Sequence, residues 1–225
     1  MLCLVRWIAV LGCCLGLVGC GASSDGTVAV ARPTVELPAP RTSGDLSLEA
    51  TLRERRSVRE FTDEPLSIQE IGQLLWAAQG ITASWGGRTA PSAGGLYPLE
   101  VYVATADGVW HYLPQDQRAE VVRDDDARGE LTSAAHDQDP VGDAPAVIVI
   151  TAVPARTAAK YGDRAERYVQ LEAGHVAQNV LLQAVALDLG AVPIGAFDDD
   201  DVASVLLLDP DQVPLYLIPV GHPAA

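Results

Sequence analysis

The chain has 225 residues, of which 48% are hydrophobic and 20% are charged, so it is long enough and apolar enough to fold as one globular domain. Its 30 acidic and 15 basic residues give a formal net charge of −15. This charge argues against nucleic acid as a partner, because a phosphate backbone requires a basic face, and against electrostatic adhesion to an anionic bilayer.

The N-terminus predicts an export signal with a lipid anchor. Arg6 supplies a positive charge, and residues 7–18 form an apolar stretch that is too short to span a bilayer. The sequence Leu17-Val18-Gly19-Cys20 resembles the bacterial lipobox, in which the cysteine becomes the acylated first residue of the mature protein. We therefore expect a signal peptide over 1–19, lipidation of Cys20, and an exported protein anchored at the extracytoplasmic side of a bacterial membrane. An ordinary secretory signal is the alternative interpretation.

The composition beyond Cys20 predicts a linker followed by one domain. Residues 20–45 are rich in Gly, Ser, Thr, Ala and Pro and have no apolar periodicity, which is typical of a flexible linker. Residues 46–225 contain no second linker and no internal repeat, so they are predicted to form a single domain. All four cysteines lie within the first 20 residues, which excludes a disulfide framework or a cysteine metal site in that domain.

The first half of the domain alternates helical and extended patterns. A helix is predicted over 46–56, and Ser67 with Glu70 forms a capping-box pattern that opens a second helix, which Gly80 ends. The alternation of apolar and polar residues over 99–105 predicts a half-buried strand. Residues 109–113 and 119–122 are expected to pair as a hairpin.

The second half contains a buried strand and a long helix. The apolar run 144–153 predicts a central strand, and acidic residues before 200–207 favour a helix start there rather than a calcium loop. The segment 213–220 carries Pro214 and Pro219, which predicts a sheet edge or a contact with another subunit. The helix predicted over 164–189 is apolar except for a narrow stripe of Glu172, His175, Asn179 and Gln183. This pattern fits a helix buried on most sides, either in a monomeric core or against a partner helix.

A cluster of cations stands out in this acidic chain. Arg55, Arg56 and Arg59 lie within five residues beside Ser57, and guanidinium forks with a hydroxyl suit a phosphate monoester. A solvated helix end that balances the helix dipole is the alternative. The segment 88–100 is a Gly/Pro-rich turn that lets backbone approach a flat ligand. No motif for a metal or a nucleotide phosphate loop is present.

These segments together resemble the nitroreductase family of flavoproteins, and within it the SagB-type thiazole/oxazole-forming dehydrogenase branch. The resemblance runs over 52–223, and its carriers are the segments 55–61, 74–80, 91–94, 160–162, 172–179 and 194–197. It implies an α+β fold with a mainly antiparallel central sheet flanked by helices and a long central helix at a homodimer interface. It also implies FMN at each of two interfacial sites.

The resemblance assigns cofactor contacts residue by residue. The residues that match the family's FMN-binding positions are Arg55, Arg56, Ser57, Arg59, Pro91, Ser92, Gly94, Ile194, Gly195 and His222. In the family, the segment that matches 91–94 commonly belongs to the partner subunit, and the N–H of the residue that matches Gly195 faces flavin N5. His222 departs from the pattern, because the family usually has Arg or Lys between the last Gly and Pro. A neutral imidazole holds phosphate less firmly, so the resemblance predicts weak or pH-sensitive FMN binding.

Lys160 and Tyr161 match the residues that the SagB-type branch uses to remove a proton from a thiazoline or oxazoline ring. Lys160 is also the only lysine in the chain, and a lysine can lose its proton near neutrality where an arginine cannot. We expect it on a loop after the strand 144–153, although chance under an arginine-rich coding bias also explains a single lysine. The alternatives are an NAD(P)H-dependent nitro or quinone reductase, a flavin-binding lipoprotein without turnover, and a ligand-binding lipoprotein without flavin.

Overall fold

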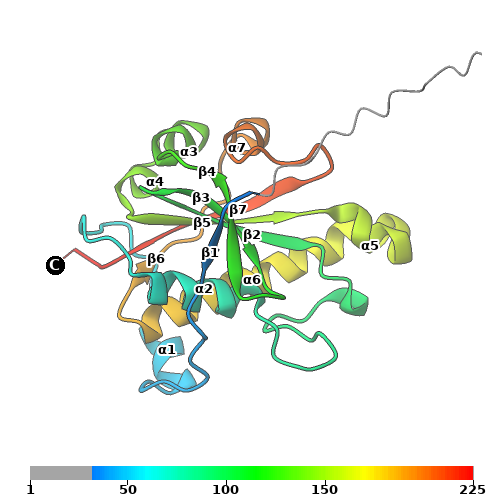
Figure 1. Cartoon of the computed structure of the whole chain (residues 1–225), viewed down its shortest axis with the longest axis horizontal. Coiled ribbons are helices and arrows are strands. Elements are labelled where there is room, and N and C mark those ends of the chain that lie inside the picture. The colour runs from blue at the N-terminus through cyan, green and yellow to red at the C-terminus, as the bar shows by residue number, and fades with distance from the viewer. Residues whose placement is uncertain (1–31, 225) are drawn as a thin grey trace, which may run out of the picture. The chain divides into compact units, whose positions relative to one another are not determined.

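The central element of the fold is one antiparallel sheet. The computed structural model describes residues 32–224, in which seven strands pair in the order β1-β4-β3-β2-β5-β7-β6 (Figure 1). The strands are β1 (Thr34–Glu36), β2 (Leu99–Thr105), β3 (Gly108–Leu113), β4 (Arg118–Arg123), β5 (Ala146–Ala152), β6 (Gly190–Ala191) and β7 (Val213–Gly221). Every pair of neighbours is antiparallel. The predicted α+β fold with an antiparallel central sheet is therefore confirmed.

Helices cover both faces of the sheet. They are α1 (Leu48–Glu54), α2 (Ile68–Gln79), α3 (Arg128–Ala134), α4 (Asp139–Asp143), α5 (Pro154–Tyr161), α6 (Ala165–Ala186) and α7 (Asp199–Val205), with short 3₁₀ turns at Ala93–Gly95 and Gly162–Arg164. Figure 1 shows α2 and α6 on one face and α3, α4 and α7 on the other. Each face has its own apolar cluster, and the strands between them supply side chains to both. Burial on two faces explains why β5 is apolar along its whole length.

The residues that predict the start and the end of a helix over 67–80 are found at the two ends of α2. Ser67 caps α2 through its hydroxyl, which accepts the N–H of Glu70 at 3.3 Å, while the Glu70 carboxylate accepts the N–H of Ser67 at 2.7 Å. Gly80 ends the helix by adopting an extended backbone, with ψ of 144°, and only glycine fits there, because a Cβ would lie 2.1 Å from Cδ1 of Trp76. The predicted capping box and helix stop are confirmed.

The predicted linker over 20–45 is wrong in its second part. Residues 34–36 form β1, which pairs with β4, and Leu37 is buried in the core. The N–H of Arg41 donates to Oε1 of Gln73 at 2.8 Å, which fixes the chain against α2. A short edge strand needs no periodicity of its own when an existing strand offers free backbone groups. Cys20 and the predicted signal peptide lie outside the described residues.

Three further expectations are corrected by the sheet and by α6. Strand β7 is not at the edge, because β5 pairs with it on one side and β6 pairs with its C-terminal end on the other. Strand β2 is covered on both faces rather than half-buried. Helix α6 buries one side, but Leu171, Gly174 and His175 are exposed within the chain, so it is not enclosed on most sides.

Candidate functional site

The arginine cluster, which we define as Arg55, Arg56 and Arg59, lies on an extended segment that follows α1. Arg55 is the C-cap of α1, and its N–H donates to the carbonyl of Thr51 at 2.9 Å. The guanidinium of Arg56 donates to the carbonyls of Arg53 and Arg55 at 2.8 and 2.7 Å. Within residues 32–224, no carboxylate forms an ion pair with any member of the cluster. The guanidinium groups of Arg55 and Arg59 are therefore free to meet an anion.

Other arginines contrast with this cluster. Arg123 pairs with Asp125 and Glu130 at 2.6 and 2.7 Å, and Arg128 pairs with Asp126 at 2.6 Å. The carboxylates raise the pKa of both guanidinium groups. Arg55, Arg56 and Arg59 are three neighbouring arginines without a carboxylate partner among the described residues, in a chain with a twofold excess of acid, which favours a binding role over a structural one.

Backbone bridges place the arginine cluster beside the C-terminus. Ser57 forms a parallel bridge with Ala191, and Phe61 forms an antiparallel bridge with Pro223. The N–H of Thr62 donates to the carbonyl of His222 at 2.9 Å. Segments far apart in sequence, including the predicted contacts Ser57 and His222, therefore meet at one end of the sheet. The His222 ring also reaches Glu70, with Nε2 3.9 Å from Oε1.

Ile194 and Gly195 follow β6 on the same side of β7. Ile194 is buried and exchanges backbone hydrogen bonds with Leu217 at 2.7 and 3.0 Å. Gly195 is exposed, and no acceptor among the described residues takes its N–H. A side chain at Gly195 would approach only the ring of Tyr216, at 4.0 Å. The structure therefore leaves this N–H open to a ligand, with Ile194 as its fixed support.

A second group of predicted residues meets at Gly94. Gly94 has a φ of +66°, and a Cβ built there would lie 2.9 Å from the Tyr161 hydroxyl and 3.0 Å from Nζ of Lys160. The Lys160 ammonium also lies 5.5 Å from the centre of the Tyr161 ring. Both reactive groups therefore converge on the missing side chain of Gly94. We call Gly94, Lys160 and Tyr161, with Ser92 beside them, the Gly94 site.

The position of Lys160 corrects one expectation. Lys160 and Tyr161 are the last two residues of α5, which begins at Pro154 directly after β5, and not part of a loop. Proline at the first helical position starts the helix because its φ is already suitable. The backbone of Lys160 is therefore held by the last turn of α5, while its side chain is exposed.

The turn that carries Pro91 and Ser92 also lines a pocket of about 250 Å³. The pocket is lined by Pro91, Ser92, Ala93, Tyr168, Leu171, Glu172 and His175. Ser92 is fixed in this turn because its hydroxyl accepts the N–H of Tyr97 at 2.9 Å. The sequence places Glu172 in the polar stripe of α6 but does not indicate a role for it in the site. The signal was a carboxylate at a position of α6 that lies among the apolar residues Val169, Ala173 and Val176 on the buried side of the helix.

The charged side chains of Arg88 and Glu100 lie next to this turn and are bound by neighbouring residues. Arg88 donates to Oε1 of Gln79 at 3.0 Å, and its guanidinium stacks on the ring of Tyr97 at 4.5 Å. Burial lowers the pKa of Arg88. Glu100 is bound by Arg156 of α5 and by His111, at 2.5 and 2.9 Å. Burial opposes ionisation of Glu100, but these two partners outweigh it and lower its pKa.

The two groups of predicted residues lie at different ends of the chain's fold. Figure 1 shows α5 and the connection between α2 and β2 at one end, and the C-terminus with the segment before α2 at the other. The arginine cluster belongs to the second end and the Gly94 site to the first. One copy of the chain therefore does not bring all the predicted cofactor contacts together.

An open apolar face lies between these ends. A pocket of about 310 Å³ between α1 and α6 is lined by Leu46, Leu48, Thr51, Trp76, Ala77, Thr89, Asn179, Leu182, Gln183 and Ala186. Large apolar side chains on the same helices are exposed, with Leu48 61% and Leu52 53% accessible. Exposed leucines around a groove are typical of a surface that a partner covers.

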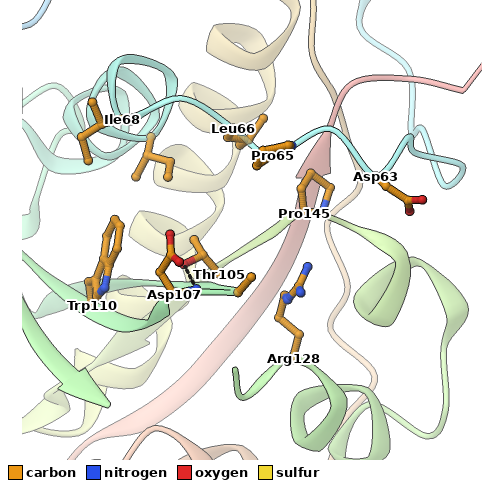
Figure 2. Close-up of a pocket in the computed structure, with 11 residues that line it drawn as sticks. Asp63, Pro65, Leu66, Ile68, Thr105, Asp107, Trp110, Arg128 and Pro145 are labelled. Carbon is orange, nitrogen blue, oxygen red and sulfur yellow. Dashed lines mark hydrogen bonds between the residues drawn. The ribbon is translucent and has the colours of Figure 1, made fainter. Parts of the chain in front are cut away.

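A separate pocket contains none of the predicted site residues. Figure 2 shows Trp110 on one side of it and Arg128 on the other, with Asp107 between them. Arg128 is already bound to Asp126 and to the carbonyl of Ala144, so it has little left to offer an anion. The part of the chain that the structure describes contains no cluster of three side chains suited to a metal ion.

Comparisons with known proteins agree on one family. The sequence matches the nitroreductase family over residues 52–222. A protein of Methanocaldococcus jannaschii whose name describes it as a nitroreductase is 42% identical over 195 residues, which cover 84% of this chain and 97% of that protein.

Solved structures give the same result. A protein of Ralstonia eutropha, also described as a nitroreductase, has 35% sequence identity and a TM-score of 0.78, and the match covers 87% of this chain and 95% of that chain. A chain of the E. coli microcin synthetase McbBCD complex, solved with truncated pro-MccB17 bound, has 27% identity and a TM-score of 0.69, with 82% of this chain and 76% of that chain covered.

Proposed function

Because this chain belongs to the nitroreductase family, we propose that it is an FMN-dependent oxidoreductase of the SagB type, which oxidises an azoline-like ring by hydride transfer to FMN. The observation that carries the proposal is the convergence of Lys160 and Tyr161 on Gly94. A lysine and a tyrosine held together at a glycine turn supply a proton acceptor and an orienting hydroxyl beside a space for a flat ring.

The residues fit FMN at both ends of the cofactor. The arginine cluster offers guanidinium groups without carboxylate partners to the phosphate, and the free N–H of Gly195 offers a donor to the flavin ring. At the flavin end of the cofactor, Gly94 leaves open a space over the turn that any side chain at this position would fill. When bound, FMN supplies a two-electron acceptor for hydride.

A homodimer would complete each site. The arginine cluster and the Gly94 site lie at different ends of one chain, so a site that contains both requires Gly94 from a second copy. The exposed leucines and the groove between α1 and α6 support such an interface. In this arrangement, two equivalent sites form, each with residues from both copies.

The chemistry assigned to the chain's own residues is proton removal. Oxidation of a thiazoline or oxazoline to the aromatic azole removes one hydride, which carries both electrons, and one proton from the neighbouring ring carbon. Lys160 accepts that proton at Nζ, and Tyr161 orients the ring through its hydroxyl. An external oxidant, dioxygen or a quinone, then restores the cofactor.

The substrate class is supported by one neighbour. The microcin synthetase complex was solved with a truncated precursor, pro-MccB17, bound to it, and one of its chains shares 27% identity with this protein. We infer a peptide or small molecule that contains an azoline ring. The pocket beside Pro91 and Tyr168 offers an apolar wall for such a ring.

Lys160→Arg tests the assignment. An arginine keeps a long basic side chain but cannot accept the proton, so the variant should keep bound FMN and the dimer while flavin reduction by a thiazoline-containing peptide falls about 10²–10⁴-fold. Arg167→Lys, the reverse exchange at an exposed position of α6, is the matched control and should leave the rate unchanged. A wild-type rate in Lys160→Arg would overturn the role of Lys160.

A nitro or quinone reductase that uses NAD(P)H is the second candidate, and the names of the M. jannaschii and R. eutropha relatives favour it. The same purified protein distinguishes the two functions. Reduction of bound FMN by NADH or NADPH, with transfer to a nitro compound and no dependence on Lys160, would support the reductase. A colourless protein without flavin would contradict both functions.

We also propose that the protein is exported and anchored through a lipid on Cys20. Among residues 32–224, no helix is long and apolar enough to cross a membrane. Because the proposed anchor is the lipid on Cys20, Cys20→Ala should release the protein from the membrane fraction into the soluble fraction. Retention of the variant in membranes would show that the anchor lies elsewhere.

A further inference from the structure

Arg156 is an arginine in the first turn of α5 that the proposed chemistry does not use. A cation at this end of a helix opposes the helix dipole, and α5 has neither an acidic residue in its first turn nor a side-chain cap. The helix has only 8 residues, so contacts outside it must hold it in place. The position of Arg156 therefore indicates a partner elsewhere in the fold.

One nitrogen of Arg156 joins α5 to two parts of the neighbouring chain. Its Nη1 lies 2.5 Å from Oε1 of Glu100 in β2, and it donates to the carbonyl of Tyr97 at 3.2 Å. The other carboxylate oxygen of Glu100 lies 2.9 Å from Nε2 of His111 in β3. The Glu100 side chain is only 18% exposed, so solvent screens this ion pair less than a surface pair. Arg156 thus attaches the start of α5 to a carboxylate that is fixed on the sheet.

Tyr97 is the strained end of the turn that carries Gly94. It has a φ of +46°, a left-handed conformation that is costly for a bulky residue, and Gly94 and Gly95 have a φ of +66°. The N–H of Tyr97 donates to the hydroxyl of Ser92 at 2.9 Å, which closes the turn, and Arg156 binds the carbonyl of the same tyrosine. A strained conformation persists only where surrounding contacts fix it. Arg156 is one of these contacts.

Arg156 and Lys160 lie four residues apart on α5, so they share one face of the helix. Nζ and Cδ of Lys160 lie 3.0 and 3.3 Å from the position that a Cβ on Gly94 would take. This face of α5 therefore meets the turn at two points, through Arg156 at Tyr97 and through Lys160 at Gly94. Because the Lys160 side chain is exposed, its place over Gly94 depends mainly on where the helix backbone lies.

We propose that Arg156 is a positioning residue, which ties α5 to the turn 92–97 and thereby keeps Lys160 and Tyr161 over Gly94. This role rests on the proposed function, because Arg156 acts through the residues assigned to proton removal. Arg156→Met keeps an unbranched side chain but offers no donor, so it separates the polar contacts from packing. It also leaves Glu100 without this ion pair, and a second variant, Arg156→Met with Glu100→Gln, removes both charges.

Hydrogen–deuterium exchange of the full chain tests the tie without any activity. The N–H groups of Gly95 and Tyr97 are bonded to Ser92 at 3.0 and 2.9 Å, so they report on the turn. In both variants, exchange over 93–97 and 157–161 should be about tenfold faster, while β5 exchanges as in wild type. Arg167→Met, at an exposed position of α6, is the matched control and should change neither segment.

Three results of the exchange experiment would overturn the proposal. The first is wild-type exchange over 93–97 in Arg156→Met. The second is an equal acceleration in β5, which would indicate a general loss of stability. The third is an acceleration that Glu100→Gln cancels, because the unpaired carboxylate, and not the lost tie, would then be the cause.

Kinetics with a thiazoline-containing peptide test the effect on the reaction. A displaced proton acceptor slows the chemical step without weakening substrate binding. Arg156→Met should therefore lower the maximal rate of FMN reduction about 10–100-fold and leave the half-saturating peptide concentration within about twofold of wild type. A wild-type maximal rate, or a change confined to the half-saturating concentration, would overturn the positioning role. If the wild-type protein oxidises no azoline, the proposed function fails, while the exchange comparison still decides whether Arg156 ties α5 to the turn.

Discussion

The two ends of the molecule hold their functional groups in different ways. The arginine cluster consists of long, mostly exposed side chains on an extended segment that backbone bridges hold at the sheet. At the Gly94 site, two side chains from the end of α5 lie over one turn, with the Tyr161 hydroxyl and Nζ of Lys160 2.9 and 3.0 Å from the position that a Cβ on Gly94 would take. The first arrangement depends on charge and tolerates small displacements, whereas the second depends on shape and does not.

This difference predicts how mutations at each end affect the protein. Removal of a guanidinium should lower affinity for an anionic cofactor in proportion to the charge lost, without any effect on the fold. A single added methyl group at the Gly94 site should disturb two reactive groups together. The following predictions test this contrast, from the largest expected effect to the smallest.

The largest effect should come from Arg55→Ala with Arg59→Ala. Each lost charge-assisted hydrogen bond costs about 1.5–3 kcal/mol, so the pair should weaken FMN binding roughly 10²–10⁴-fold. Titration of the apoprotein with FMN, followed by flavin fluorescence, measures the change. Arg53→Ala with Arg167→Ala removes the same charge at other exposed positions and should bind FMN as wild type does. Equal losses in both double variants would mean that net charge, not the cluster, controls binding.

The second prediction compares Gly94→Ala with Gly95→Ala and separates steric crowding of Lys160 and Tyr161 from backbone strain in the turn. Gly94 and Gly95 both have a φ of +66°, but a Cβ meets Tyr161 and Lys160 only at Gly94, because nothing lies within 4 Å at Gly95. Both alanine variants should lose about 1–3 kcal/mol of unfolding free energy through strain. Only Gly94→Ala should also slow substrate-dependent flavin reduction. Equal slowing in Gly95→Ala would indicate that the turn, and not the contact, is at fault.

The third prediction is a smaller change, an increase in FMN affinity in His222→Arg. A guanidinium at this position adds a permanent charge beside the arginine cluster, and Glu70, 3.9 Å from the present imidazole, competes for it. FMN binding at pH 7 should tighten by about 1 kcal/mol, or roughly fivefold. His136→Arg adds the same charge at an exposed site on another part of the chain and should change nothing. Unchanged affinity in His222→Arg would place His222 outside the phosphate site.

The smallest effect concerns stability and pH. Because burial raises the pKa of Glu172 in the folded state, the folded chain binds more protons than the unfolded chain between the ordinary glutamate pKa, about 4.3, and the raised value. The unfolding free energy should therefore fall as pH rises through that window. Glu172→Gln should remove this decline and be more stable than wild type above it. Parallel melting-temperature curves for the two proteins would contradict the raised pKa.

Much of the fold could be predicted because its signals are local. The capping box of Ser67 and Glu70, the apolar run of β5 and the hairpin of β3 and β4 all appear where the sequence indicates them. The helix predicted over 46–56 is shorter, because the chain leaves helical geometry at Arg55. The helices α3, α4 and α5 were not predicted, since they are short and carry little periodicity.

The candidate site was predicted by type but not by geometry. The sequence indicated which residues to consider, including Ser57, Pro91 and His222, because they occur in short motifs. It placed Lys160 on a loop and gave Glu172 no function. A loop and a short helix after a strand have similar composition, so their distinction depends on the packing of α5 against α6.

By itself, the sequence determined the helices with caps and period, the buried central strand and the family to which the chain belongs. Only the tertiary structure decided that Lys160 and Tyr161 meet at Gly94, that Glu172 and Ser92 line the same pocket, and that β7 lies inside the sheet. The physical reason is the separation in sequence over which each kind of interaction acts. Caps and periodicity act between residues three or four positions apart, whereas these contacts join segments far apart in the chain, and only the packed backbone sets their distance.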